Sequence, residues 1–150
     1  MAKISNTVNI ENRKAKFDYQ FLDTLTAGLV LKGTEIKSIR EGKAGLSDSY
    51  CYFRNDELFI KNFHITEYTD ASFYQHEPLR ERKLLLSRQE LNKLLKRVKD
   101  SGLTIVPIKL FINDRGFAKL NIALAKGKKD YDKRDDIKKR DIEREMNRKF

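Results

Sequence analysis

The sequence predicts a mainly β protein, a small antiparallel barrel with two or three short helices and a C-terminal tail. Segments 49–65 and 103–125 alternate apolar and polar residues around central turn-forming residues, which is typical of β-hairpins. Segment 87–102 has the apolar spacing and the end signals of a helix. Residues 126–150 are mostly charged and cannot bury enough apolar surface to fold alone. We therefore expect a loose N-terminus over 1–11, a barrel over 12–125 and a basic tail over 126–150.

The first strand is expected within 14–33, where Gly33 ends it, and is long or bent. Asp23 interrupts a set of apolar residues that otherwise fall on one face of a period-two pattern. These residues are Phe17, Tyr19, Phe21, Leu25, Ala27, Leu29 and Leu31. A short helix follows over 34–41, where Ile36 and Ile39 are three residues apart and Gly42 ends the pattern.

The first hairpin is expected to turn at Asn55-Asp56, because both residues tolerate turn conformations. Residues 66–83 are polar and expected to be irregular. The helix over 87–102 begins with a capping box made by Ser87 and Glu90. Its apolar stripe consists of Leu91, Leu94, Leu95 and Val98.

The second hairpin is expected to turn at 113–116. In its last strand, the alternation directs Leu120, Ile122 and Leu124 to one face. Lys119 and Asn121 then point the other way, to solvent or to a ligand. Small antiparallel barrels often bind oligonucleotides, although the fold alone does not give the function.

The net charge of the 150-residue chain is +10 and its pI is about 9.7. A protein this basic usually meets a polyanion, with nucleic acid the first candidate and an acidic membrane surface the second. The alternative is that the basic surface contacts only solvent and has no polyanionic partner. The basic residues cluster at 12–16, 80–83, 93–99 and 126–129.

Catalytic and metal-binding patterns do not emerge from the sequence. The single cysteine, Cys51, excludes an internal disulfide and is expected to be a buried, inert thiol. His64 and His76 lack metal-ligand spacing, and no P-loop or nucleophile elbow is present. We expect no enzyme, metal or cofactor. The N-terminus has no apolar secretory segment and no apolar run could span a membrane, so a cytosolic protein is expected.

The tail combines both signs of charge with a weak helical signal. Ile142, Met146 and Phe150 are spaced by four. We expect a tail that is disordered in isolation and becomes helical in a charged groove. A solubilising tail without a partner is the alternative, and the aromatic Tyr131 among the charges argues against it.

Four segments resemble a known family: "NRKAKFDY", "AGLVLKGTEIKSIREGKAGLSDSY", "RKLLL" and "LAKGKKDYDKRDDIKKRD". From Asn12 to about Arg144 the chain is similar to the SsrA-binding protein, or small protein B (SmpB), family. The resemblance implies an OB-like barrel that binds the tRNA-like domain of transfer-messenger RNA and carries it to stalled ribosomes. There the tail would enter the decoding centre and the empty mRNA channel and become helical. The implied partners are this RNA and the ribosome; a monomer without cofactor is expected.

The resemblance also implies site residues. Those expected to bind transfer-messenger RNA are Asn12, Arg13, Lys14, Thr26, Leu86, Lys119, Lys126 and Lys128. Those expected to act on the ribosome are Lys129, Tyr131, Lys133, Arg134, Lys138 and Arg140. Thr26 stands where the family commonly has glutamate, so it offers a hydroxyl but no charge.

Two other functions remain open on the residues alone. One is a general RNA-binding barrel without a role in ribosome rescue, which would not need this tail. The other is a hydrolytic enzyme that acts on RNA, for which the sequence offers no catalytic constellation.

Overall fold

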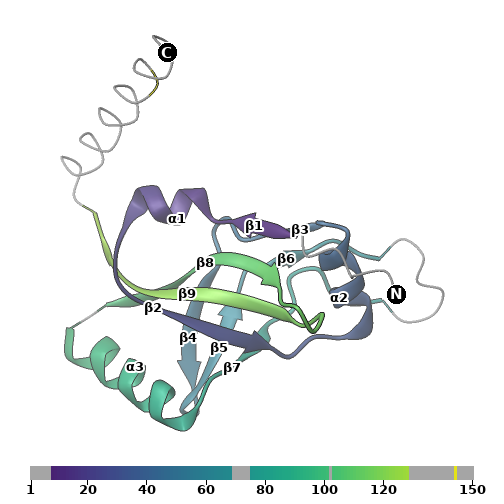
Figure 1. Ribbon diagram of the computed structural model, residues 1–150. Helices are drawn as coiled ribbons and strands as arrows, with labels where there is room; N and C mark the ends of the chain where they lie inside the picture. Colours follow the sequence, from purple (N-terminus) through teal and green to yellow (C-terminus); the bar gives the residue numbers. More distant parts are fainter. Residues whose placement is uncertain (1–7, 69–74, 102, 129–143, 145–150) are drawn as a thin grey trace.

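The computed structural model describes residues 8–68, 75–101, 103–128 and 144. Within these ranges, seven strands form one antiparallel sheet in the order β1-β8-β4-β5-β7-β2-β9 (Figure 1). Strand β8 also pairs with β9, which closes six of the strands into a ring. The short β1 pairs with β8 on the edge that β8 shares with β4. The predicted small antiparallel barrel is thereby confirmed.

The elements follow one another with short connections. The strands are β1 Asn9–Glu11, β2 Tyr19–Leu29, β3 Ala44–Gly45, β4 Tyr50–Arg54, β5 Glu57–Lys61, β6 His64–Ile65, β7 Arg82–Leu85, β8 Thr104–Ile112 and β9 Ala118–Gly127. The helices are α1 Arg13–Asp18, α2 Gly33–Arg40 and α3 Arg88–Ser101. Figure 1 shows α1 and α3 on opposite sides of the barrel and α2 at one end. No helix among these is long and apolar enough to cross a membrane.

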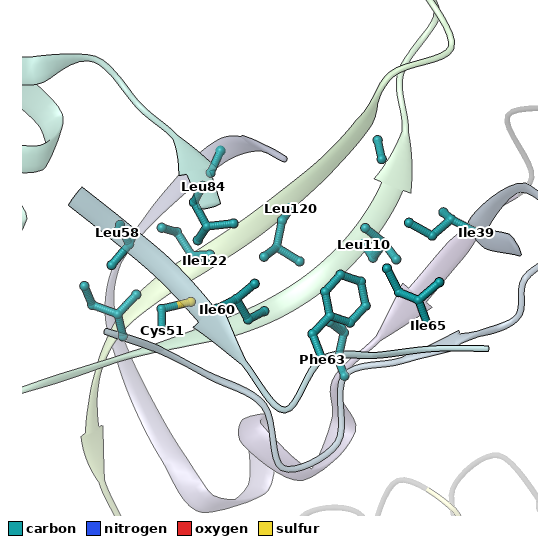
Figure 2. Close-up of a cluster of buried hydrophobic side chains, with 14 of the residues drawn as sticks. Ile39, Cys51, Leu58, Ile60, Phe63, Ile65, Leu84, Leu110, Leu120 and Ile122 are labelled. Carbon is teal, nitrogen blue, oxygen red and sulfur yellow. The ribbon is translucent and has the colours of Figure 1, made fainter. Parts of the chain in front are cut away.

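The main core fills the inside of the barrel (Figure 2). Successive side chains of a strand point to opposite faces, so every second residue enters the core. In β9 these are Leu120, Ile122 and Leu124, all at most 1% exposed, as predicted. Cys51 is buried among them, and its burial raises the pKa of the thiol. The thiol therefore stays protonated and unreactive, as expected.

Both predicted hairpins are present. Asn55 and Asp56 join β4 to β5 with positive φ angles of 52° and 62°. Two consecutive positive φ values are the signature of the type I′ turn that matches the twist of paired strands. The β8–β9 hairpin turns at 113–116, where Gly116 has φ 84°.

The predicted helix α3 has the predicted cap. The Ser87 hydroxyl accepts a hydrogen bond from the Glu90 backbone N–H at 3.2 Å, and the Glu90 carboxylate accepts one from the Ser87 N–H at 3.1 Å. Leu91 and Leu94 from its apolar stripe are buried in the main core. The expected helix before Gly42 is also present as α2.

The first strand differs from its prediction in two ways. Residues 13–18, expected to begin the strand, instead form α1. Strand β2 also contains an irregularity between Phe21 and Asp23, where its register with β9 shifts. Because one inserted residue reverses the parity of a strand, Tyr19 and Phe21 do not share a face with Leu25. Tyr19 and Phe21 pack in a second, smaller apolar cluster.

That second cluster lies between the barrel and α1. Ala15 of α1 packs there with Val106, Ala123 and Ala125, all at most 5% exposed. The helix therefore covers part of the outer surface of β8 and β9. Strand β1 lies in the stretch expected to be loose, and it pairs with β8 through Ile10 and Leu110.

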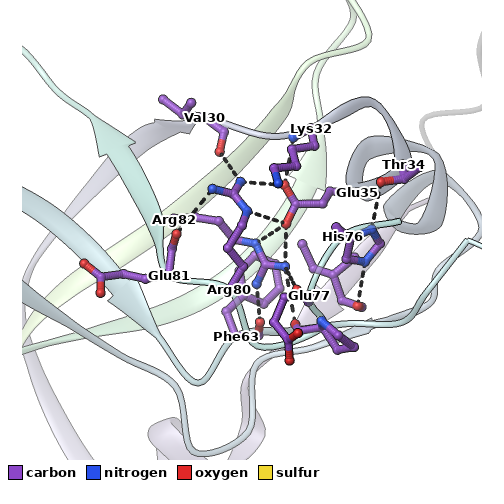
Figure 3. A network of polar contacts seen from close by, with 12 residues as sticks. Val30, Lys32, Thr34, Glu35, Phe63, His76, Glu77, Arg80, Glu81 and Arg82 are labelled. Atoms are coloured by element: carbon purple, nitrogen blue, oxygen red, sulfur yellow. Dashed lines mark hydrogen bonds and ion pairs between the residues drawn. The ribbon is translucent and has the colours of Figure 1, made fainter. Parts of the chain in front are cut away.

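A buried ion-pair network anchors the segment before β7 (Figure 3). Glu35 and Arg82 are both fully buried, and the Arg82 guanidinium lies 2.5 Å from the Glu35 carboxylate. The same carboxylate accepts hydrogen bonds from Arg80 at 2.6 Å and from the Lys32 N–H at 2.7 Å. Burial alone would raise the pKa of Glu35, but the hydrogen bonds from Arg80 and Lys32 and the charge of Arg82 outweigh it and hold the pKa below 4.5.

His76 completes this anchor. Its Nδ1 lies 2.9 Å from the Thr34 hydroxyl and its Nε2 lies 2.9 Å from the Ile65 carbonyl oxygen. Only 2% of His76 is exposed, so the ring joins α2 and β6 inside the protein. The part of segment 66–83 that the structure describes is therefore held in place, although its sequence predicted irregular structure.

Candidate nucleic-acid interface

One part of the barrel's outer surface carries basic, aromatic and amide side chains on neighbouring strands, and we call it the outer face. It consists of Thr26, Leu85, Lys109, Phe111, Lys119 and Asn121. The register pairs Lys109 of β8 with Asn121 of β9, and Asn121 with Thr26 of β2. It likewise pairs Phe111 with Lys119. Paired residues share a face of a sheet, and the neighbouring residues of β9 point into the core. The predicted outward direction of Lys119 and Asn121 is confirmed.

Among the described residues, no carboxylate lies within 4.0 Å of the amino groups of Lys109 and Lys119, the two lysines of the outer face. The Lys109 ammonium lies 5.9 Å from the centre of the Phe111 ring. Unpaired cations beside an aromatic ring suit a partner that has phosphates and bases.

Thr26 is exposed and engaged with a neighbour. Its hydroxyl donates a hydrogen bond to Oδ1 of Asn121 at 2.8 Å. This bond fixes the orientation of the Asn121 amide, whose N–H groups point away from the accepting oxygen. Thr26 therefore contributes to the outer face by orienting the Asn121 side chain.

Because Gly28 of β2 has no side chain, Leu85 of β7 and Lys119 of β9 can approach it closely. A Cβ at this position would lie 3.3 Å from the Cβ of Leu85 and 3.7 Å from Nζ of Lys119. Leu85 is 50% exposed on the outer face, whereas Leu86 packs against the main core. The predicted site residue Leu86 therefore supports the surface from inside, and Leu85 is the leucine that reaches it.

Helix α1 places three predicted residues in different environments. Asn12 is 4% exposed and caps the helix, its Oδ1 accepting from the Ala15 N–H at 3.1 Å. Its Nδ2 donates to the carbonyl oxygens of Leu46 and Pro107 at 3.2 and 3.0 Å. Asn12 therefore holds α1 on the barrel, and its polar atoms face inward.

Arg13 and Lys14 are exposed on the same helix. Lys14 forms an ion pair with Asp48 at 2.5 Å, and the hydrogen bond and charge of Asp48 raise the pKa of Lys14. Because Asp48 already neutralises Lys14, Arg13 offers a polyanion more net charge.

The end of β9 brings the remaining basic residues beside α1. Lys126 is exposed and pairs with Gln20 in the register of β2 and β9. The Lys128 N–H donates to the Asp18 carbonyl oxygen at 2.9 Å, and its amino group donates to the Lys16 carbonyl oxygen at 3.3 Å. The chain thus leaves the barrel held against the C-terminal end of α1.

The side of the barrel around β4 and β5 is electrically different. Glu57 forms ion pairs with Lys83 at 3.6 Å and with Arg88 at 2.8 Å, and Arg54 pairs with Glu81 at 2.9 Å. Each of these cations has a carboxylate partner, so this side attracts a polyanion less than the outer face does.

The basic cluster at 80–83 is engaged by carboxylates of the protein. Arg82 is fully buried and Arg80 also binds the Glu35 carboxylate. Lys83 pairs with Glu57. Carboxylates far away in the sequence therefore neutralise these cations.

The tail residues predicted to act on the ribosome lie outside the described residues. They are Lys129, Tyr131, Lys133, Arg134, Lys138 and Arg140. Over the ranges that the structure does describe, no three His, Cys, Asp or Glu side chains group as metal ligands.

Comparisons with known proteins show the family of the chain. A family model described as SmpB protein matches residues 9–150. The chain belongs to the SmpB protein family. A relative called SsrA-binding protein, from Christiangramia forsetii, is 59% identical over 145 residues, which cover 97% of this chain and 92% of the relative. The SsrA-binding protein of Enterococcus faecalis is 49% identical over 148 residues, with 99% and 96% covered.

An SmpB structure matches as well. A solved chain described as "tmRNA-SmpB: a journey to the center of the bacterial ribosome" aligns with a TM-score of 0.69 and 45% identity. The alignment covers 83% of this chain and 87% of that one. The family predicted from four sequence segments is therefore confirmed.

Three residues of the outer face were absent from the sequence prediction. They are Leu85, Lys109 and Phe111. Alternation in residues 103–112 could have assigned Phe111 to the side opposite Leu110. Lys109 follows an irregularity in β8 between Pro107 and Lys109, which strict alternation does not anticipate.

Proposed function

We propose that this chain binds the tRNA-like domain of transfer-messenger RNA and delivers it to stalled ribosomes. The observation that carries the proposal is the outer face, with unpaired lysines beside Asn121 and Phe111 in a member of the SmpB family. Phosphate contacts from lysines supply affinity, and rings or amides contact exposed bases. The protein acts by binding in the cytosol, without a catalytic step or a cofactor.

RNA binding and ribosome rescue are assigned to different parts of the chain. The outer face, Arg13 and Lys126 bind the RNA, while Asn12 and Leu86 support this surface from within. The tail from Lys129 reads the decoding centre and the empty mRNA channel of the ribosome. Support for this division comes from the end of β9, because the Lys128 N–H holds the exit of the tail against α1.

The experiment is a gel-shift titration of transfer-messenger RNA with excess tRNA as competitor. Two proteins are compared, the full chain and a chain that ends at Lys128, which keeps the bond to Asp18. We expect both to bind with similar affinity and to resist tRNA, because recognition lies in the barrel. Both should lose affinity as salt rises, since phosphate contacts release counterions.

Two outcomes would contradict the proposal. Equal competition by tRNA would indicate a general RNA-binding barrel. Loss of binding in the shortened chain would assign RNA recognition to the tail instead of the outer face. Circular dichroism of the shortened chain verifies that its barrel remains folded.

A further inference from the structure

The turn between β8 and β9 exposes an aromatic ring at the end of the outer face. Phe117 is 62% exposed, more than any other large apolar side chain of the described residues. Figure 1 shows this turn beside α2. Exposing a large apolar ring is unfavourable in water, so a ring held in this way marks a candidate contact.

Hydrogen bonds fix the turn that carries the ring. Oδ1 of Asn113 accepts from the N–H groups of Arg115 at 3.1 Å and Phe117 at 2.9 Å. The Asn113 N–H donates to the Phe117 carbonyl oxygen, and the Gly116 N–H donates to the Asn113 carbonyl oxygen, both at 2.9 Å. The backbone at Phe117 is thus organised before any partner arrives, which lowers the entropic cost of binding.

Two arginines accompany the ring. Arg40 of α2 donates from Nη2 to the Gly116 carbonyl oxygen at 3.4 Å, which brings its guanidinium to the turn. A guanidinium has five N–H donors, so this bond leaves others for a phosphate. Arg115 is exposed in the turn itself, and Asp114 beside it adds one opposing charge. The turn therefore has two positive charges, from Arg40 and Arg115, and one negative charge, from Asp114.

The turn between β8 and β9, with Phe117, adjoins the outer face along the same hairpin. Phe117 precedes Lys119 by two residues, and the backbone bond from the Asn113 N–H to its carbonyl oxygen extends the β8–β9 pairing to it. Phe117, Lys119 and Asn121 therefore follow one another along the same side of the hairpin. Phe111 and Lys109 lie on the neighbouring strand. Along these two strands, aromatic rings and lysines therefore alternate from the turn toward α1.

We propose that Phe117 is a stacking platform for an unpaired RNA base, with Arg40 and Arg115 contacting the adjoining phosphate. Single-stranded RNA presents bases that stack on aromatic rings, and arginine binds phosphate through paired donors. The net charge of +10 and the lysines that follow the ring along β9 and β8 favour a polyanionic partner over a protein surface. The inference deepens the proposed function, because it assigns the turn a class of RNA element.

The chain contains no tryptophan, so Phe117→Trp introduces a single fluorescent reporter at the turn. The probe is a short single-stranded oligoadenylate titrated against the full-length protein. A base stacked on the indole should quench its fluorescence with a saturating curve, and an RNA duplex of equal length should quench it less. The matched control is Leu79→Trp, because Leu79 is 52% exposed and belongs to the segment before β7 and not to the hairpin. Absence of saturable quenching at the turn, or equal quenching in both variants, would overturn the site.

Phe117→Ala supplies the second measurement. Base stacking on an aromatic ring contributes enough that its loss weakens binding of single-stranded RNA by about fivefold or more. Phe117→Tyr should retain the affinity, because it keeps a stacking ring. Equal affinity of Phe117→Ala and the unmodified protein for oligoadenylate and for transfer-messenger RNA would overturn the site.

The same titrations separate the two proposals. If Lys119→Ala weakens binding of transfer-messenger RNA while Phe117→Ala does not, the stacking site fails and the proposed function stands. If the unmodified protein does not select transfer-messenger RNA over tRNA, the proposed function fails. In that case, quenching of the Phe117→Trp fluorescence by oligoadenylate still tests whether Phe117 is a stacking site.

Discussion

The Thr26 hydroxyl and the Asn121 amide oxygen join β2 to β9 by a hydrogen bond of 2.8 Å on the outer face. The bond lies in register, since Thr26 is the cross-strand partner of Asn121. Thr26 therefore acts on the surface by orienting a neighbour. A carboxylate at this position can only accept hydrogen bonds, so it would bind the Asn121 N–H groups and turn that amide over.

Thr26→Val removes the hydroxyl and retains the shape of the side chain. We expect a several-fold loss of affinity for transfer-messenger RNA, because the Asn121 amide loses its fixed orientation. The free energy of unfolding should fall by less than about 1.5 kcal/mol, since this is one hydrogen bond at an exposed site. Fluorescence anisotropy and urea denaturation measure the two quantities. Thr24→Val, at an exposed position of the same strand, should leave the affinity unchanged; equal losses in both variants would contradict this role.

Lys119→Ala should weaken RNA binding and reduce its dependence on salt. Loss of one phosphate contact lowers the slope of log affinity against log salt by about 0.7 to 0.9. Lys83→Ala is the matched control, because Glu57 of β5 already neutralises Lys83. Titrations at several salt concentrations measure both slopes. A shallower slope for Lys83→Ala, with no change for Lys119→Ala, would show that the RNA binds around β5.

Asn12→Ala should act through stability. It removes the cap of α1 and the Asn12 donor to the Pro107 carbonyl oxygen, whereas the Leu46 carbonyl oxygen keeps the Ser49 N–H as a donor at 3.1 Å. A lost cap costs about 1 kcal/mol and a buried unsatisfied group about 1–3 kcal/mol, so we expect a loss of about 2–4 kcal/mol in unfolding free energy. Urea denaturation measures this loss.

Arg13→Ala provides the contrast to that variant. Arg13 is exposed, so its removal should leave the stability within about 0.5 kcal/mol and lower the affinity for RNA. A stable Asn12→Ala protein with weakened RNA binding would instead indicate a direct contact from Asn12.

Local sequence patterns were sufficient to predict the hairpins and α3. The positive φ values at Asn55 and Asp56 and the reciprocal bonds of Ser87 and Glu90 arise from residues close together in the chain. Turn chemistry and capping act over a few residues, so a single sequence contains the whole signal.

Features that depend on distant residues were missed. Asn12 binds Leu46 and Pro107, which are 34 and 95 residues away, and this fixes α1 in a stretch that otherwise reads as a strand. Glu35 and Arg82 are 47 residues apart, so the sequence could not show that the basic cluster at 80–83 turns inward. Cross-strand register likewise places Leu85 next to Gly28. Burial and pairing of this kind are properties of the folded chain.

Lys133→Ala combined with Arg134→Ala tests the tail. Both residues follow the end of β9 in the sequence and are not among the residues that form the outer face. We expect unchanged affinity for transfer-messenger RNA and loss of peptide tagging on stalled ribosomes. Gel shift and a reconstituted tagging assay measure these two properties. Lys93→Ala combined with Lys96→Ala, which removes two exposed cations from α3, is the charge-matched control and should tag normally. Reduced RNA affinity in the tail variant would contradict the division of roles.

Glu35→Gln tests the buried ion pair through pH. The pKa of Glu35 lies below 4.5 in the folded protein, so its ion pairs stabilise the fold above the unfolded-state pKa. That stabilisation is lost as the pH falls through the folded-state pKa, because protonation leaves the buried Arg82 without a counter-charge. Glu35→Gln removes the counter-charge at every pH, which should cost about 3–5 kcal/mol near neutrality.

Urea denaturation from pH 7 down to pH 3 measures this difference. The gap between the unmodified protein and Glu35→Gln should be largest at pH 7 and should narrow below about pH 4.5, where Glu35 begins to protonate in the unfolded chain. Glu67→Gln, at an exposed position, should follow the unmodified protein throughout. A gap that stays constant with pH would show that the Glu35 charge does not stabilise the fold, and that its shape and hydrogen bonds do so instead.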